Sequence, residues 1–185
     1  NGIKGVLEER FLDLGQHIRS VEDFSLLCQT PAAALGSCRL KIKERTQLEQ
    51  IITVLRRHDI GYFIYIGGND SMDAVKKLTE YSKKINYEMV FMGVPKTIDN
   101  DLEKTDHTPG FGSAAKYVAT VMQEITCDCA VYTVKAVTVV EVMGRDAGWL
   151  TAAAGLPRLI GEKTADLIYL PEVPFDEDRF IEDIK

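Results

Sequence analysis

The hydrophobic pattern along the chain alternates between two kinds of segment. In some segments apolar residues recur every three to four positions, which is typical of helices with one buried face. Between them lie short apolar runs rich in β-branched and aromatic residues, which are typical of buried strands. The predicted helices are 6–18, 44–58, 72–84, 110–126, 147–155 and 176–184. The predicted strands are 62–66, 88–94, 136–142 and 167–170, and 25–36 is predicted to be a loop.

This order of elements predicts the fold class. Strands that alternate with helices form an α/β fold, in which helices cover both faces of a mostly parallel sheet. Ligands of such sheets bind at the carboxyl ends of the strands. A polar segment follows each of the four predicted strands. We therefore expect these segments to converge on one cleft.

Composition narrows the function classes. The chain has 185 residues, is 45% hydrophobic and carries a formal net charge of −6. Acidic charge argues against nucleic-acid and membrane-surface partners, and no apolar run approaches the roughly 20 residues of a membrane span. The four cysteines contain no C-x-x-C pair, so we expect reduced thiols in a cytoplasmic enzyme. They are Cys28, Cys38, Cys127 and Cys129.

The first polar segment, 67–71, has the features of an anion site. Gly67 and Gly68 let the backbone approach an anion, and the following helix offers free N–H groups at its N-terminus. The side-chain oxygens of Asn69 and Asp70 suit Mg²⁺ or its water shell. A tight turn capped by the side chain of Asp70 or Ser71 has the same sequence. The segment alone leaves both interpretations open.

The second polar segment, 95–101, concentrates charged and hydroxyl groups at a strand end. Asp99 and Asp101 project the same way if the segment is extended. One carboxylate then accepts a proton while the other holds a metal, with Lys96 or Mg²⁺ offsetting their repulsion. The alternative is a solvated turn, because Asp and Asn are common turn residues.

The third polar segment, 141–148, places an arginine between a predicted strand and a predicted helix. Arg145 can clamp a phosphoryl group through two hydrogen bonds, and Gly144 leaves room for a ligand beside the backbone. A surface ion pair of Arg145 with Glu141 or Asp146 is the other interpretation.

Together these segments resemble the phosphofructokinase family along nearly the whole chain. The Gly-Gly-Asn-Asp-Ser, Pro-Lys-Thr-Ile-Asp-Asn-Asp, Met-Gly-Arg and Pro-Glu segments occur in the family's order and approximate spacing. Segment 35–39 is similar to the family's Gly-Ser-x-Arg stretch, whose arginine contacts the phosphoryl donor. The resemblance implies two parallel-sheet sandwich domains that face a cleft: a donor domain over 1–108 and a fructose 6-phosphate domain over 109–185. It also implies a fragment, with the family's first strand expected before residue 1 and a basic stretch after residue 185.

Two positions indicate which phosphoryl donor is used. Relatives that use ATP have a glycine where this chain has Asp70, and a small residue where it has Lys96. Both differences are typical of pyrophosphate-dependent members. The resemblance therefore implies reversible phosphoryl transfer from pyrophosphate to the 1-hydroxyl of fructose 6-phosphate, giving the 1,6-bisphosphate in glycolysis. Asn69 departs from the family's usual aspartate, and Lys135 stands where many relatives have an arginine.

The resemblance also assigns roles to individual residues. Asp99 is expected to accept the hydroxyl proton, while Lys96 and Arg145 stabilise charge on the transferring group. The residues implied for the sugar phosphate are Thr97, Ile98, Asp99, Met143, Gly144, Arg145 and Glu172. Those implied for the donor are Arg39, Gly67, Gly68, Asp70, Ser71 and Lys96, with Asn69 and Asp101 for Mg²⁺. A homo-oligomer is expected for the full-length protein.

Three other functions stay open at this point. An ATP-dependent 6-phosphofructokinase has the same fold and acceptor. A non-catalytic regulatory subunit is expected to lose the acid that Asp99 supplies here. A lipid or dinucleotide kinase shares a Gly-Gly-Asp turn, but the Met-Gly-Arg and Pro-Glu segments argue against it.

Overall fold

The computed structural model describes residues 2–185 and divides the chain into two compact units. The first unit is Asn1–Pro95 and the second is Lys96–Lys185. Each unit has a hydrophobic cluster of its own.

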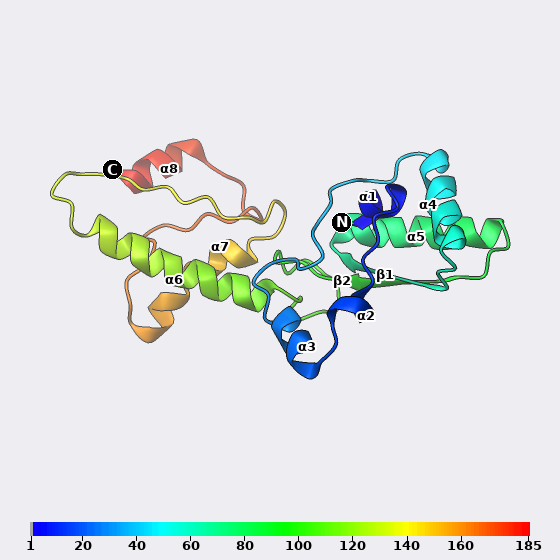
Figure 1. Cartoon of the computed structure of the whole chain (residues 1–185). Helices are drawn as coiled ribbons and strands as arrows, with labels where there is room; N and C mark the ends of the chain where they lie inside the picture. The colour runs from blue at the N-terminus through cyan, green and yellow to red at the C-terminus, as the bar shows by residue number, and fades with distance from the viewer. Residues whose placement is uncertain (1) are drawn as a thin grey trace. The chain divides into compact units, whose positions relative to one another are not determined.

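The first unit is built on a β-α-β motif. Strand β1 (Tyr62–Gly67) leads into helix α5 (Asn69–Lys84), which returns the chain to strand β2 (Val90–Pro95). The two strands are parallel, and their register places Tyr62 opposite Val90 and Gly67 opposite Pro95. Figure 1 shows α5 and helix α4 (Arg45–Arg57) on one side of the strands. The parallel α/β arrangement predicted from the sequence is confirmed.

The core of this unit forms where α4, α5 and helix α1 (Gly2–Leu7) meet. Ile3, Ile51 and Leu78 are fully buried there, and Leu55 nearly so. Burying one such side chain stabilises a fold by about 1.5–3 kcal/mol. This packing holds the N-terminus of α5 against the end of β1.

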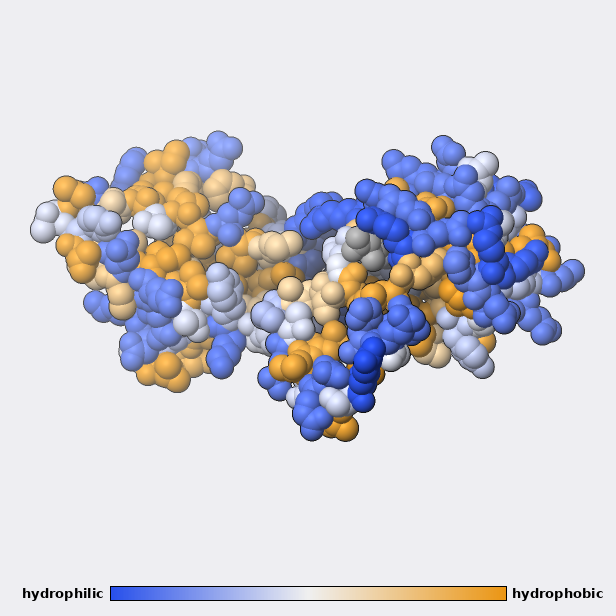
Figure 2. Space-filling model, viewed as in Figure 1, coloured by the Kyte–Doolittle hydropathy of each residue, from blue (hydrophilic) through white to orange (hydrophobic). Residues whose placement is uncertain are grey.

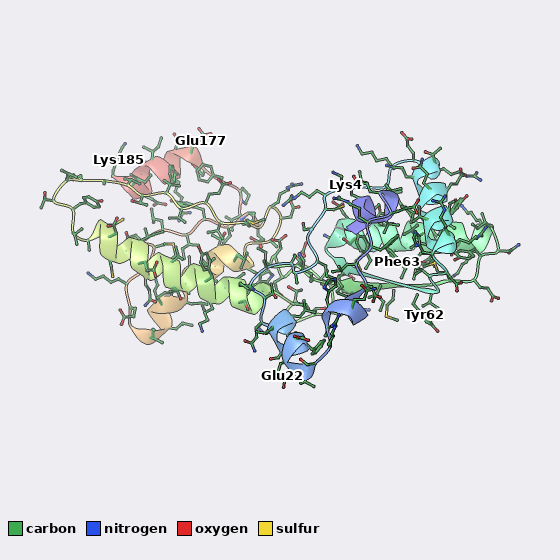
Figure 3. All side chains as sticks on the ribbon, in the orientation of Figure 1. Lys4, Glu22, Tyr62, Phe63, Glu177 and Lys185 are labelled. Carbon is green, nitrogen blue, oxygen red and sulfur yellow. The ribbon has the colours of Figure 1, made fainter. Side chains whose placement is uncertain are left out.

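The strands are covered on one face only among residues 2–185. Tyr62 and Phe63, labelled in Figure 3, show the alternation: Phe63 packs on the core, whereas Tyr62 is 76% exposed. Ile64 and Ile66 share the exposed face with Tyr62. The prediction of helices on both faces therefore holds for one face in the part of the chain that the structure describes.

The predicted helix over 6–18 is wrong. Helix α1 ends at Leu7, and a short helix α2 (Leu14–His17) follows after an irregular stretch. Glu9 adopts a left-handed backbone with φ of 51°, which a helix cannot continue through. The side chain of Asp13 accepts a hydrogen bond from the Gly15 backbone at 2.9 Å and so starts α2 separately.

The predicted loop over 25–36 begins later than expected, because helix α3 (Val21–Cys28) extends into it. A capping box starts this helix. The Ser20 hydroxyl accepts from the Asp23 backbone at 3.1 Å, and the Asp23 carboxylate accepts from the Ser20 backbone at 3.1 Å.

The second unit is mainly helical. It contains α6 (Phe111–Cys129), α7 (Trp149–Ala153), a 3₁₀ helix (Leu156–Ile160) and α8 (Glu177–Ile184). Its hydrophobic cluster joins α6 to α7 through Ala115, Leu150 and Ala153. No helix among residues 2–185 has both the length and the apolar character of a membrane span.

The predicted strands over 136–142 and 167–170 are not strands in the described chain. A strand requires a hydrogen-bonded neighbour, and neither segment has one within residues 2–185. Val137 and Val139 are accordingly 61% and 77% exposed. Figure 2 shows the hydrophobic residues at the surface of this unit.

The structural division falls after Pro95, whereas the predicted domain boundary lies between residues 108 and 109. The segment between the two positions belongs physically to the second unit: Thr97 forms a bridge with Gly110, and Ile98 packs against the α6–α7 cluster. The assignment of donor and sugar-phosphate domains stays a prediction.

Candidate functional site

The Gly67–Gly68 pair leads directly into α5. Asn69 is the first residue of that helix, so Asn69, Asp70 and Ser71 form its first turn, and the predicted start at residue 72 is late by one turn. A Cβ on Gly67 would lie 2.1 Å from Ser71 Oγ, so only glycine fits there. Gly68 is the N-cap, and no side chain caps the helix. The capped-turn interpretation is therefore wrong, and the helix N-terminus is free of a competing side-chain acceptor.

A second segment of the first unit contributes charge beside this turn. Lys41 Nζ lies 2.9 Å from Asp70 Oδ1, and both side chains are more than half exposed. Arg39, two residues earlier, is exposed and forms no ion pair in the part of the chain that the structure describes. Asp70, one of the predicted donor residues, is thus paired with Lys41, which was not predicted from the sequence.

In the second unit, side-chain hydrogen bonds fold the segment 97–108 into a closed loop. The Thr108 hydroxyl donates to the Thr97 carbonyl at 2.6 Å. The Asn100 side chain accepts from the Thr108 backbone at 2.9 Å and donates to the Asp106 carbonyl at 3.1 Å. Asn100 and Thr108 are both buried, so these bonds are shielded from water.

Asp99 occupies the bend of this loop. Its backbone N–H donates to the Thr97 hydroxyl at 3.1 Å, which fixes the turn. Within residues 2–185, Asp99 Oδ1 is the one buried side-chain oxygen or nitrogen without a hydrogen-bond partner. Native proteins rarely leave a buried polar atom unpaired, and such exceptions gather at functional sites. Asp99 is therefore the strongest candidate for a reacting group.

The loop does not place Asp99 and Asp101 as an extended segment would. Asn100 between them has a left-handed backbone with φ of 56°, which breaks the alternation of side chains. Asp99 is half-buried, whereas Asp101 is exposed. The prediction that both carboxylates project in the same direction assumed an extended chain. The chain is not extended at Asn100.

The segment around Arg145 is shaped by Gly144. This glycine has φ of 129°, and a Cβ there would lie 2.2 Å from the Ala147 carbonyl oxygen. The turn leaves Met143 and Arg145 exposed on either side of it. Neither Lys96 nor Arg145 forms an ion pair among the described residues, so both are available to an anion.

The side chain of Glu172 links its own segment to the turn that follows Arg145. Its Oε1 accepts a hydrogen bond from the Gly148 backbone at 2.7 Å, at the N-terminus of α7. A Cβ on Gly148 would lie 2.6 Å from Glu172 Oε2, so a larger residue here would displace the Glu172 carboxylate. Glu172 therefore supports the turn after Arg145, and its predicted contact with the sugar phosphate remains a prediction.

Two of these segments share one hydrophobic support. Ile98, next to Asp99, and Val142, next to Met143, both pack against the cluster of Ala115, Leu150 and Ala153. The side chain of Ile98 is thus partly buried by this packing, and its predicted substrate contact stays a prediction. A groove of ≈ 490 Å³ lies beside Gly144. Its other walls are residues 140–142, Thr151, 169–171 and 173–175.

No three His, Cys, Asp or Glu side chains within residues 2–185 gather into a metal-binding cluster. Mg²⁺ does not need one, since it is commonly held by one or two carboxylates together with substrate phosphates and waters. The exposed carboxylate of Asp101, one of the two residues predicted to hold Mg²⁺, is an oxygen ligand of that kind. The chemistry of this loop therefore fits Mg²⁺.

Sequence reasoning missed Asn100, Thr108 and Lys41. Asn100 carried a usable signal, because asparagine is the non-glycine residue that most readily adopts a left-handed turn. Thr108 and Lys41 gave none, since each acts through a contact with a residue well separated in the sequence.

Comparisons with known proteins show the family to which the chain belongs. The family described as Phosphofructokinase matches residues 1–185. Two relatives, from Methylococcus capsulatus and Halomonas elongata, are named pyrophosphate–fructose 6-phosphate 1-phosphotransferase. The first is 46% identical over 98% of this chain and 44% of its own length. The second is 47% identical over 95% of this chain and 43% of its own length.

A solved structure extends the likeness to the fold. A pyrophosphate-dependent phosphofructokinase from Nitrosospira multiformis has a TM-score of 0.87 and 44% identity, over 99% of this chain and 46% of the other. The chain belongs to the phosphofructokinase family. It spans less than half the length of these relatives.

Proposed function

We propose that the full-length protein transfers a phosphoryl group reversibly from pyrophosphate to the 1-hydroxyl of fructose 6-phosphate. The observation that carries this proposal is the buried, unpartnered Oδ1 of Asp99 in a loop fixed by Asn100 and Thr108. The two relatives from Methylococcus capsulatus and Halomonas elongata, which match nearly all of this chain, bear the name of that activity.

Asp99 supplies the base in this proposal. As the 1-hydroxyl oxygen attacks phosphorus, its proton passes to the Asp99 carboxylate, the phosphoanhydride bond breaks and orthophosphate leaves. The backbone bond of Asp99 to Thr97 fixes the turn that carries the carboxylate, which supports its positioning for this role.

Lys96 and Arg145 supply positive charge. Phosphoryl transfer depends mainly on positioning and on electrostatic stabilisation of the transferring group. Both side chains are exposed and without an ion pair among the described residues, so binding an anion disrupts no existing pair. The residues proposed to contact the sugar phosphate are Thr97, which follows Lys96, and Met143 and Gly144, which precede Arg145.

Mg²⁺ belongs to the proposal as the ion that neutralises the donor's phosphates. Asp101 would hold it, with Asn69 as the second residue proposed for this role. The Asp70 carboxylate is already paired with Lys41. This pairing favours Asp101 as the carboxylate ligand.

The donor assignment rests on Asp70 and Lys96. Asp70 adds volume and a carboxylate at the start of α5, where a helix N-terminus otherwise favours phosphate. A compact donor fits beside that side chain more easily than a nucleotide does. Gly67, Gly68, Ser71 and Arg39 complete the proposed donor contacts.

We also propose a cytoplasmic homo-oligomer. Cys28, Cys38, Cys127 and Cys129 are all free, as is usual in a reducing compartment. The exposed valines of 131–143 and the uncovered face of β1 are apolar surfaces of the kind that assembly buries.

The test is a donor assay on the full-length protein. Purified enzyme is supplied with fructose 6-phosphate and Mg²⁺, and kcat/KM is measured with pyrophosphate and with ATP side by side. The proposal predicts turnover with pyrophosphate and little or none with ATP. Turnover with ATP alone would refute the donor assignment while leaving the family intact.

A further inference from the structure

The segment that precedes α4 is anchored along α5. Ile42 is 4% exposed and belongs to the core of the first unit. Its carbonyl accepts a hydrogen bond from Lys77 Nζ at 3.1 Å, and Lys77 also pairs with Asp73 Oδ2 at 2.6 Å. A buried side chain and a lysine bridge therefore hold this segment in place.

The contacts along α5 have a helical spacing. Asp70, Asp73 and Lys77 are three and four residues apart, which puts them on one face of the helix. Lys77 binds the segment at Ile42, and Lys41 contacts Asp70 at 2.9 Å, nearer the start of the helix. The backbone anchor at Ile42 thus delivers the Lys41 ammonium to the first turn of α5.

The charge on Asp70 creates a conflict at this turn. Its carboxylate stands at a helix N-terminus that is proposed to receive phosphates, and like charges repel there. The repulsion acts on pyrophosphate as well as on ATP. The volume of the side chain can discriminate between the two donors, but its charge alone cannot.

We propose that Lys41 is a positioning and specificity residue of the donor site, acting through Asp70. It holds the Asp70 carboxylate at the start of α5 and neutralises its charge, so that the side chain excludes a nucleotide by volume while the site still accepts pyrophosphate. This inference rests on the proposed function. Lys41 and Asp70 together exclude the nucleotide and still accept pyrophosphate, which neither residue does alone.

The pair has little to do with stability. Exposed ion pairs contribute little to folding because solvent screens them and ordering two long side chains costs entropy. A loss of function on breaking this pair therefore comes with an unchanged melting temperature. That combination separates the proposed role from a structural one.

The experiment uses the full-length enzyme with pyrophosphate as the varied substrate. In Lys41→Met the KM for pyrophosphate should rise on the order of tenfold, with a smaller change in kcat, because an uncompensated carboxylate faces the donor. Lys41→Arg should restore much of the affinity. The matched control is Lys76→Met, which removes an exposed lysine without an ion pair elsewhere on α5.

A double-mutant cycle completes the test. In an Asp70→Asn background there is no charge to neutralise, so adding Lys41→Met should change the KM for pyrophosphate little. An unchanged KM in Lys41→Met, or an equal rise in both backgrounds, would overturn the inference. The proposed function fails separately, if the unmutated enzyme does not use pyrophosphate at all.

Discussion

At the scale of single residues, the environments of the two loop carboxylates differ sharply. Asp99 is half-buried and leaves one oxygen unpaired, whereas Asp101 is exposed to solvent. An unpaired buried carboxylate oxygen is unfavourable for folding. Its retention is explained if the oxygen is paired by a substrate hydroxyl or a metal during turnover. This difference supports the proposal of Asp99 as the base, and Asp101 stays the proposed metal ligand.

The first prediction concerns that base. Asp99→Asn keeps the shape of the side chain but removes the proton acceptor, so kcat should fall about 10²–10⁴-fold while fructose 6-phosphate still binds. Steady-state rates and a sugar-phosphate binding titration on the full-length enzyme measure both quantities. Asp106→Asn is the control, because it removes an exposed carboxylate from the same loop. A near-normal kcat in Asp99→Asn would place the proton acceptor elsewhere.

The second prediction concerns Lys96. Lys96→Gly removes one charge-assisted contact with the donor or the transition state, a loss of about 1.5–3 kcal/mol. Because the same transition state is crossed both ways, kcat/KM should fall in the forward and the reverse reaction alike. Should the change affect only the KM for the sugar phosphate, Lys96 contacts the acceptor and not the donor.

The candidate residues of the loops could be named from the sequence, because loop motifs keep their chemistry in consecutive positions, and their roles stay predictions. The contacts that support them could not be named in this way. Lys41 meets Asp70, and Glu172 meets Gly148, only after the chain has folded. Local sequence contains no information on such pairs unless the fold is already known.

At the scale of elements, the loop 97–108 depends on one side chain at its centre. Asn100 satisfies the buried Thr108 backbone N–H and the Asp106 carbonyl while adopting the left-handed backbone of the turn. The loop is thus braced from inside, and Asp99 is positioned by a residue that does not itself need to touch substrate.

The third prediction tests this brace. Asn100→Gly still allows the left-handed backbone but leaves the buried N–H of Thr108 unpaired. The free energy of unfolding should therefore fall by about 1–3 kcal/mol. Asn100→Asp keeps the acceptor for Thr108 but loses the donor to the Asp106 carbonyl and buries a charge, so it should be destabilised as well. Urea unfolding of the three proteins gives the order. Equal stabilities would show that water or another group replaces the Asn100 bonds.

The end of α1 is fastened to the end of α4 by charge. Glu9 pairs with Arg57 and accepts a bond from His58 Nε2 at 3.0 Å. The hydrogen bond to His58, and after it the bond and charge of Arg57, hold the pKa of Glu9 below its ordinary value of 4.5. A carboxyl with a lowered pKa stabilises the fold above its unfolded pKa, and that contribution is lost as pH falls through the folded pKa.

The fourth prediction follows from that sign. Glu9→Gln should be less stable than the unmutated protein near neutral pH, and the difference should shrink as pH falls below 4.5. Urea unfolding at several pH values measures this, with Glu80→Gln as the control for an exposed glutamate without an ion pair among the described residues. A difference that stays constant across pH would mean that the carboxylate charge is not what matters.

Elements with strong local patterns were predicted well. Helices α4, α5 and α6 and strands β1 and β2 lie where periodicity placed them, within a few residues. The elements that were predicted wrongly depend on parts of the chain that are distant in the sequence. Glu9 has a left-handed backbone after the end of α1 and pairs with Arg57 of α4, and the segments 136–142 and 167–170 have strand composition but no neighbouring strand within residues 2–185.

At the scale of the whole molecule, each of the two units carries some of the residues proposed for the site. The first carries Arg39, Lys41 and the start of α5, and the second carries Lys96, Asp99 and Arg145. The family and the fold follow from a match over residues 1–185 and from a TM-score of 0.87. The chain spans less than half of its relatives, so activity is a property to be measured on the full-length protein.

The reverse reaction is the sharpest test of the proposed donor, because it requires the enzyme to make pyrophosphate. Full-length enzyme is given fructose 1,6-bisphosphate, orthophosphate and Mg²⁺, and pyrophosphate and fructose 6-phosphate are quantified. We predict that both products form together, in proportion to the orthophosphate consumed and without any nucleotide. Asp99→Asn should abolish most of this turnover. Conversion that requires ADP and yields ATP, with no pyrophosphate formed, would contradict this prediction.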